Sequence, residues 1–122
     1  MDDWLLSTIA QVEEAVAEVS HLLDEGIAVI DAARTDREAG VPLPVLAAAL
    51  LERGARPRRA IQAAFLRYEQ AVSLLRARVV RALIEDEGLS RTQIATAMHV
   101  SRQTVSRLYE AGSRTAQRVE RP

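Results

Sequence analysis

Hydrophobic residues recur along most of the chain at alternating steps of three and four, the spacing of an amphipathic helix. The first such series lies within residues 3–34, and its stripe consists of Leu5, Ile9, Val12, Val16, Val19, Leu23, Gly26 and Ile30. This is a heptad seam of about four repeats, and another helix has to cover it. That helix is either the same segment in a second subunit or a later helix folding back. Gly26 marks a point where the first helix could break.

Prolines and glycines divide the middle of the chain. Residues 35–40 are predicted to form a loop, followed by a short apolar helix over residues 44–53 that ends at Gly54. Pro57 favours the start of a second long helix, which we expect to stop at Gly88. Strand patterns are nearly absent. The predicted fold class is therefore all-α, with long N-terminal and central helices followed by a C-terminal helix-turn-helix.

The net charge of −1 conceals two halves of opposite sign. Residues 1–52 carry eleven acids and two arginines, a net charge of −9, whereas residues 53–122 carry fourteen arginines and six acids, a net charge of +8. Charge blocks of this kind indicate a division of roles, and the basic half is the candidate for a polyanionic partner.

The motif with the clearest chemistry lies within residues 90–112. Ser90 and Gln93 have the spacing of a capping box, which predicts a helix from Arg91. His99 falls where the chain has to turn, and Ser101 is a suitable N-cap for a second helix, expected to close at Gly112.

Ala95, Val100, Val105 and Leu108 have the positions that hold two such helices at a steep angle, with a small residue at the crossing. The polar residues between them are left to point outward, where arginine and glutamine suit base edges and serine suits phosphate. The predicted DNA-contacting residues are Arg91, Thr92, Ser101, Arg102, Gln103, Thr104, Ser106 and Arg107.

This stretch resembles the prokaryotic helix-turn-helix of lambda-repressor/Cro-like regulators and of resolvase-invertase C-terminal domains. The resemblance covers about 22 residues. It implies a positioning helix over residues 91–98 and a recognition helix over residues 102–110. One departure is His99, where these families usually have glycine. The remainder of the chain indicates no subfamily.

The sequence gives no support for a metal, cofactor or catalytic site. The chain has no cysteine, and its two histidines, His21 and His99, lack metal-ligand spacing. No phosphate-binding glycine motif or nucleophile motif is present, so we expect no enzyme activity, no cofactor and no metal. The longest apolar run is too short to cross a bilayer, and a cytoplasmic, nucleoid-associated bacterial protein is expected.

We divide the chain into an acidic helical part at residues 1–56 for oligomerisation, a DNA-binding domain at residues 57–112, and a basic flexible tail at residues 113–122. The tail is expected to add nonspecific phosphate contacts through Arg114, Arg118 and Arg121. The favoured interpretation is a homodimeric transcriptional regulator that binds double-stranded DNA sequence-specifically, paired through the N-terminal and central helices. Two alternatives remain open. One is a helical interaction module, adaptor or antitoxin-like, whose acidic half binds another protein. The other is a nonspecific architectural DNA binder.

Overall fold

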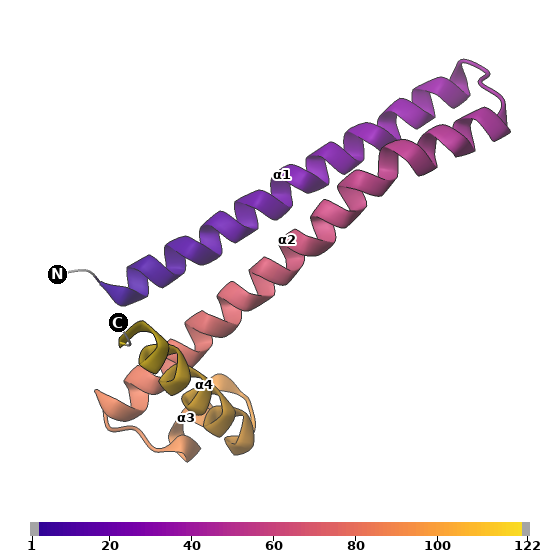
Figure 1. Cartoon of the computed structure of the whole chain (residues 1–122). Coiled ribbons are helices and arrows are strands. Elements are labelled where there is room, and N and C mark those ends of the chain that lie inside the picture. Colours follow the sequence, from indigo (N-terminus) through magenta and orange to yellow (C-terminus); the bar gives the residue numbers. More distant parts are fainter. Residues whose placement is uncertain (1–2, 121–122) are drawn as a thin grey trace. The chain divides into compact units, whose positions relative to one another are not determined.

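The structure is a computed structural model that describes residues 3–120, with side chains as far as Arg114. It has four helices in chain order: α1 Trp4–Glu38, α2 Leu43–Glu85, α3 Arg91–Met98 and α4 Arg102–Glu120 (Figure 1). The described residues contain no strand. The predicted all-α class, with two long helices ahead of a helix-turn-helix, is confirmed.

Helix α1 is continuous through Gly26, so this glycine does not break the first helix. The Asp3 carboxylate caps its first turn and accepts hydrogen bonds from the backbone N–H groups of Leu5 and Leu6 at 2.9 and 3.2 Å. The helix extends beyond the predicted end near residue 34, so the predicted loop at residues 35–40 is too long. The chain instead turns at Gly40, whose φ of +90° favours glycine.

Helix α2 corrects a second prediction, because Gly54 and Pro57 do not separate two helices. Pro57 lies inside one helix that runs from Leu43 to Glu85. Proline in a helix interior removes one backbone hydrogen bond. Burial of Leu46 before Pro57 and of Ala64 after it holds both halves in one hairpin with α1. The expected stop is confirmed, since Gly88 has a φ of +67° just after the helix.

Two compact units make up the chain. The hairpin unit is Gln11–Glu69, and the C-terminal unit combines Met1–Ala10 with Gln70–Pro122. The predicted domain division at residues 1–56, 57–112 and 113–122 stays a prediction. The two units are described separately below.

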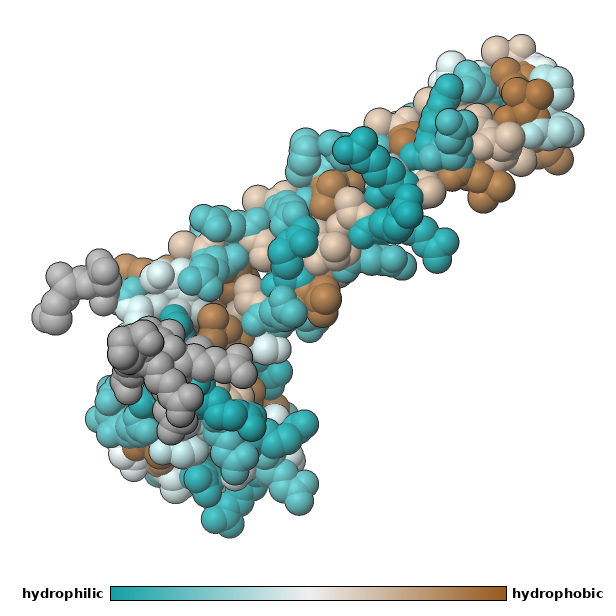
Figure 2. All heavy atoms as spheres, viewed as in Figure 1, coloured by the Kyte–Doolittle hydropathy of each residue, from teal (hydrophilic) through white to brown (hydrophobic). Residues whose placement is uncertain are grey.

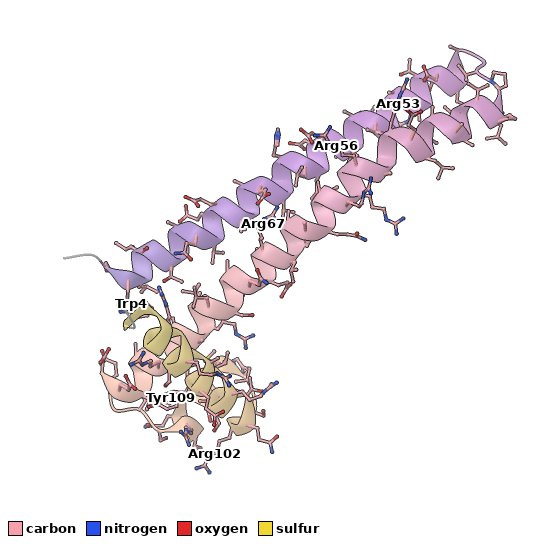
Figure 3. The ribbon with its side chains drawn as sticks, viewed as in Figure 1. Trp4, Arg53, Arg56, Arg67, Arg102 and Tyr109 are labelled. Atoms are coloured by element: carbon pink, nitrogen blue, oxygen red, sulfur yellow. The ribbon has the colours of Figure 1, made fainter. Side chains whose placement is uncertain are left out.

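The hairpin unit pairs α1 with α2 through small side chains, and its buried apolar residues are Ala15, Leu46 and Ala64. An ion pair joins the two helices, in which the Arg67 guanidinium donates to both carboxylate oxygens of Glu18, from Nε at 3.1 Å (Figure 3). These hydrogen bonds lower the pKa of Glu18 and raise the pKa of Arg67. The predicted seam of α1 is therefore covered in part by a later helix of the same chain.

The C-terminal unit is built on Val80, Ile94 and Val105, which are fully buried and come from α2, α3 and α4. The first turns of α1 belong to this unit. The buried Thr8 hydroxyl donates to the Trp4 carbonyl at 2.7 Å and accepts from Arg78 Nη1 at 2.8 Å. The buried Thr8 hydroxyl therefore both donates and accepts a hydrogen bond.

Helix α4 corrects a third prediction, because Gly112 does not end the recognition helix. The helix continues to Glu120, and Gly112 is buried against α2. A Cβ added to Gly112 would lie 2.7 Å from the Ala77 carbonyl oxygen, so glycine permits close packing here. The flexible basic tail at residues 113–122 stays a prediction, and the phosphate contacts expected of Arg118 and Arg121 concern side chains outside the described residues.

Candidate nucleic-acid interface

Two caps fix the first helix of the motif. The Gln93 backbone N–H donates to Ser90 Oγ at 3.1 Å, and the Ser90 N–H donates to Gln93 Oε1 at 2.8 Å. This is the predicted capping box. At the other end, His99 adopts the left-handed conformation, with φ 56° and ψ 43°. The predicted turn is confirmed, and histidine takes the place that glycine usually fills.

The second helix starts at the predicted N-cap. Ser101 Oγ accepts a hydrogen bond from the Thr104 backbone N–H at 3.1 Å and lies 2.9 Å from Thr104 Oγ1. The Val105 N–H donates to the Ser101 carbonyl at 3.2 Å. Both caps use side chains within three residues of the groups that they satisfy, so the angle of the turn is encoded locally.

The inward faces of the two helices match the prediction. Ile94 and Val105 are fully buried, and Val100 and Leu108 pack partly buried against them. Ala95 also packs against this core, as expected of the small residue at the crossing. The polar faces of α3 and α4 are consequently turned to solvent.

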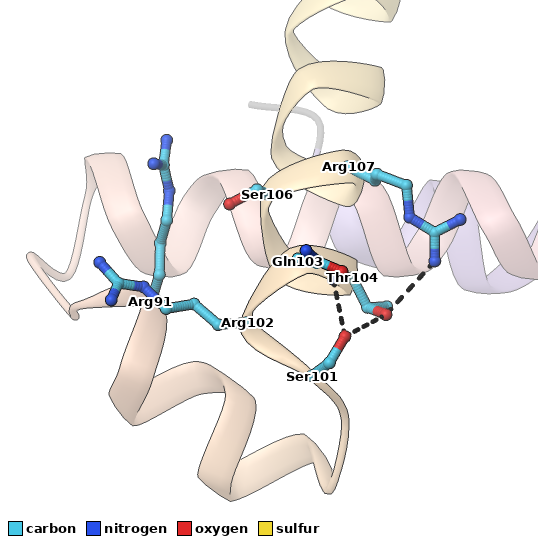
Figure 4. Close-up of a pocket in the computed structure, with 7 residues that line it drawn as sticks. All are labelled: Arg91, Ser101, Arg102, Gln103, Thr104, Ser106 and Arg107. Carbon is cyan, nitrogen blue, oxygen red and sulfur yellow. Dashed lines mark hydrogen bonds between the residues drawn. The ribbon is translucent and has the colours of Figure 1, made fainter.

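Seven of the eight predicted DNA-contacting residues come together around one surface concavity of about 720 Å³ (Figure 4). They are Arg91, Ser101, Arg102, Gln103, Thr104, Ser106 and Arg107. Thr92 is exposed nearby on α3 but does not line this surface. The lining residues include three arginines and no acid, which gives the concavity a positive charge suited to an anion.

The side chains differ in how firmly they are held. Arg107 Nη2 donates to Thr104 Oγ1 at 3.3 Å, so Ser101, Thr104 and Arg107 form one hydrogen-bonded row along α4. Arg102 projects away from the helices into solvent (Figure 3). Among the described residues no ion pair holds Arg102, which leaves its five donors available.

Arg91 rests on an aromatic support. Its guanidinium carbon lies 5.5 Å from the centre of the Tyr109 ring, within the range of a cation–π contact. The Tyr109 hydroxyl donates to Glu85 Oε1 at 3.0 Å, and Arg81 Nε donates to Glu85 Oε2 at 3.0 Å. Tyr109 thus joins α4 to the end of α2 beside the concavity.

Sequence reasoning missed Arg76 and assigned Arg114 to the tail, although both lie beside the opposite flank of α4. Arg76 and Arg114 line a second concavity that shares Thr104 and Arg107 with the first. Arg114 lies seven residues after Arg107, so an unbroken recognition helix would have placed both on one face. The seven-residue spacing indicates nothing when Gly112 is predicted to end the helix. No local pattern relates Arg76 to α4.

Between residues 3 and 120, no helix is both long and apolar enough to cross a membrane. The same part of the chain has no group of three or more metal-ligating side chains.

Comparison with known proteins supports the geometry. A protein-family model described as a homeodomain-like domain matches residues 70–117, which lie within the C-terminal unit and include α3. No curated protein and no solved structure matches the chain. The match supports a helix-turn-helix DNA-binding domain without assigning its subfamily.

Proposed function

We propose that the protein is a homodimeric transcriptional regulator of bacterial type that binds double-stranded DNA sequence-specifically. The observation that carries the proposal is the outward face of α4. Arg102 and Gln103 are exposed on a positively charged concavity, while Val105 on the other side of the helix is fully buried. A helix anchored in this way can enter a major groove with its N-terminal residues against the base edges.

The type of each residue around the concavity determines which part of the DNA it is suited to contact. Arg102 is suited to bidentate contact with guanine O6 and N7, and Gln103 to contact with adenine N6 and N7. Ser101, Thr104 and Ser106 offer hydroxyl groups to the backbone or to bases. The arginines at the rim are suited to phosphates, Arg91 from α3 and Arg107 from α4, and Arg107 can also reach a base. Thr92, on the exposed side of α3, adds a further phosphate contact.

A dimer gives this small surface its specificity. One recognition helix covers only a few base pairs, whereas two subunits related by a two-fold axis bind half-sites about 34 Å apart on a pseudo-palindrome. We assign the pairing to the long helices α1 and α2. Several large apolar side chains of the hairpin unit are exposed, as Ile27 and Ile30 are.

The test is selection of bound sequences from random double-stranded DNA, followed by gel shift of the selected and scrambled duplexes at two salt concentrations. We expect a selected inverted repeat, and an affinity for it on the order of 10³-fold or more above that for scrambled DNA. Affinity for both duplexes should fall as salt rises.

Three other outcomes would overturn the proposal. Equal binding of all sequences would assign the chain to nonspecific architectural proteins. Failure to bind any duplex would remove the role assigned to α4. A stoichiometric protein partner captured by a chain that binds no DNA would favour the interaction module.

A further inference from the structure

The hairpin unit carries an apolar face that its own two helices leave uncovered. On α1 the side chains of Leu23, Ile27 and Ile30 are 43, 54 and 58% exposed. Together with Leu50 and Ile61 of α2 they line a groove of about 390 Å³. Figure 2 shows apolar side chains reaching the surface along the hairpin. The predicted seam is thus split, with part of it turned toward α2 and part turned outward.

The buried core of this unit is too thin to be a complete layer. Its buried apolar residues include two alanines, Ala15 and Ala64, whereas several leucines and isoleucines stay in contact with water. Two helices that each keep an apolar stripe are stabilised by a second layer of helices, as in a four-helix bundle. The groove face is the surface on which that second layer would pack.

The net charges of α1 and α2 indicate what kind of surface covers the groove face. Helix α1 carries eight acids and two arginines, a net charge of −6. Residues 43–69 of α2 carry five arginines and two acids, a net charge of +3. Arg58 lines the groove itself, and among the described residues it has no ion pair. The hairpin is therefore complementary in charge to a second hairpin of the same sequence.

We infer that a second copy of this chain packs on the groove face with its α2 against α1 of the first, and its α1 against α2. This arrangement results when the two-fold axis runs parallel to the helices. It puts an acidic helix beside a basic one at both new contacts. An axis perpendicular to the helices would instead place α1 against α1, with −6 facing −6. The inference deepens the dimer of the proposed function by naming its interface.

The first test changes the groove face and measures mass in solution without DNA. The unaltered chain should have twice the 13.4 kDa mass of one chain at micromolar concentration. Ile27→Arg combined with Ile30→Arg should weaken the dimer at least ~100-fold, because each chain would bury two cations against the basic α2 of its partner. Leu66→Arg is the matched control, since Leu66 is 60% exposed but does not line the groove.

The control should leave the mass unchanged. A dimer that survives the double substitution, or a chain that is monomeric without any substitution, would overturn the inference. Circular dichroism at the same concentration shows whether the double variant still folds. If it does not, the second test applies.

The second test uses cysteine crosslinking, which the cysteine-free chain makes unambiguous. A Cβ at Gly26 would lie 3.6 Å from Ile61 Cδ1, which places Leu23 and Phe65 at the same level of the hairpin. Leu23 lines the groove, and Phe65 follows the groove residue Ile61 by four positions, so it shares the face of α2 that Ile61 occupies. The two side chains are 43 and 44% exposed. One chain carries Leu23→Cys and another Phe65→Cys, and the two are mixed and oxidised.

The arrangement with α1 of one copy against α2 of the other predicts that the mixed disulfide between residues 23 and 65 forms several-fold more than either symmetric disulfide, 23 to 23 or 65 to 65. A majority of the Leu23→Cys symmetric product would place α1 against α1 and overturn it, and so would the absence of crosslinks. Both tests are done without DNA. Their failure would therefore leave DNA binding to be judged by sequence selection alone. A chain that is monomeric but still selects a half-site would contradict the inferred interface and leave sequence-specific DNA binding in place.

Discussion

Gly112 packs directly on the backbone of Ala77. A Cβ at position 112 would lie 2.7 Å from the Ala77 carbonyl oxygen and 3.2 Å from its carbonyl carbon. Real Cβ atoms do not approach backbone so closely, so α4 can lie against α2 here only because residue 112 has no side chain. The contact fixes the recognition helix to the rest of the C-terminal unit.

Gly112→Ala should therefore destabilise the protein although alanine is the better helix former. We expect a loss of about 1–3 kcal/mol in the free energy of unfolding, because either α4 or the α2 backbone has to move. Glu110→Ala is the control, since Glu110 is exposed on the same helix. That change should alter the free energy of unfolding by less than about 0.5 kcal/mol. Urea unfolding measures both, and a neutral Gly112→Ala would contradict the packing described.

His99 gives a second prediction, because it holds a left-handed conformation that costs a side-chain-bearing residue energy. His99→Gly should raise the free energy of unfolding by about 1 kcal/mol. Ala97→Gly, on an exposed position of α3, should instead lower it by about 1 kcal/mol. Thermal unfolding of the two variants is the measurement. Destabilisation by both would mean that the His99 side chain, rather than its backbone, holds the turn.

Arg102 and Arg91 should respond differently to removal. Arg102→Ala should cost roughly 1–3 kcal/mol of discrimination between the selected site and a duplex altered at one base pair. Arg91→Ala should weaken binding to all sequences and reduce the slope of log affinity against log salt by about 1. Arg59→Ala, an exposed arginine of the hairpin unit, is the control. Uniform loss of affinity in Arg102→Ala would reassign Arg102 to phosphate.

The Glu18–Arg67 pair predicts a dependence of stability on pH. Arg67 lowers the pKa of Glu18 in the folded state below its ordinary value of 4.5. Ionised Glu18 therefore stabilises the fold above about pH 4.5, and this stabilisation is lost as the pH falls through the lowered folded pKa. Glu18→Gln should reduce stability at pH 7 and bring it toward that of the unaltered chain at low pH.

The control for this pair is Glu14→Gln, an exposed acid of the same helix without an ion pair among the described residues. Its stability relative to the unaltered chain should change little with pH. Because the Glu18 carboxylate is exposed, the effect should also shrink at high salt. A difference that persists at low pH would indicate lost packing rather than lost charge.

The helix-turn-helix was predictable because its determinants are local. Ser90 with Gln93, the turn at His99, and Ser101 with Thr104 each act within a few residues, so sequence spacing alone locates them. Gly54, Pro57 and Gly112 are wrongly predicted as helix boundaries for the opposite reason. Packing against distant segments keeps both helices continuous, through the buried Leu46 and Ala64 of α2 and through Gly112 against Ala77, and no local preference reveals such packing.

The same distinction separates the parts of the candidate interface. The outward residues of α4 follow from helical periodicity once Val105 is assigned to the core. Arg76 reaches the edge of this surface only because α4 folds back on α2, a relation between residues about 30 positions apart. Sequence periodicity also predicts that α1 needs cover but does not divide its stripe between α2 and the exposed groove.

The hydroxyl of Thr8 has a practical bearing on how the DNA-binding part can be isolated. A fragment that starts at Gln70 would lose Thr8, leaving the Arg78 guanidinium without its acceptor and removing the Trp4 turn that belongs to the same compact unit. A shortened protein intended for crystallisation with a duplex should therefore keep the first ten residues. A linker that spans the excised hairpin would join the two distant pieces of chain that form one body.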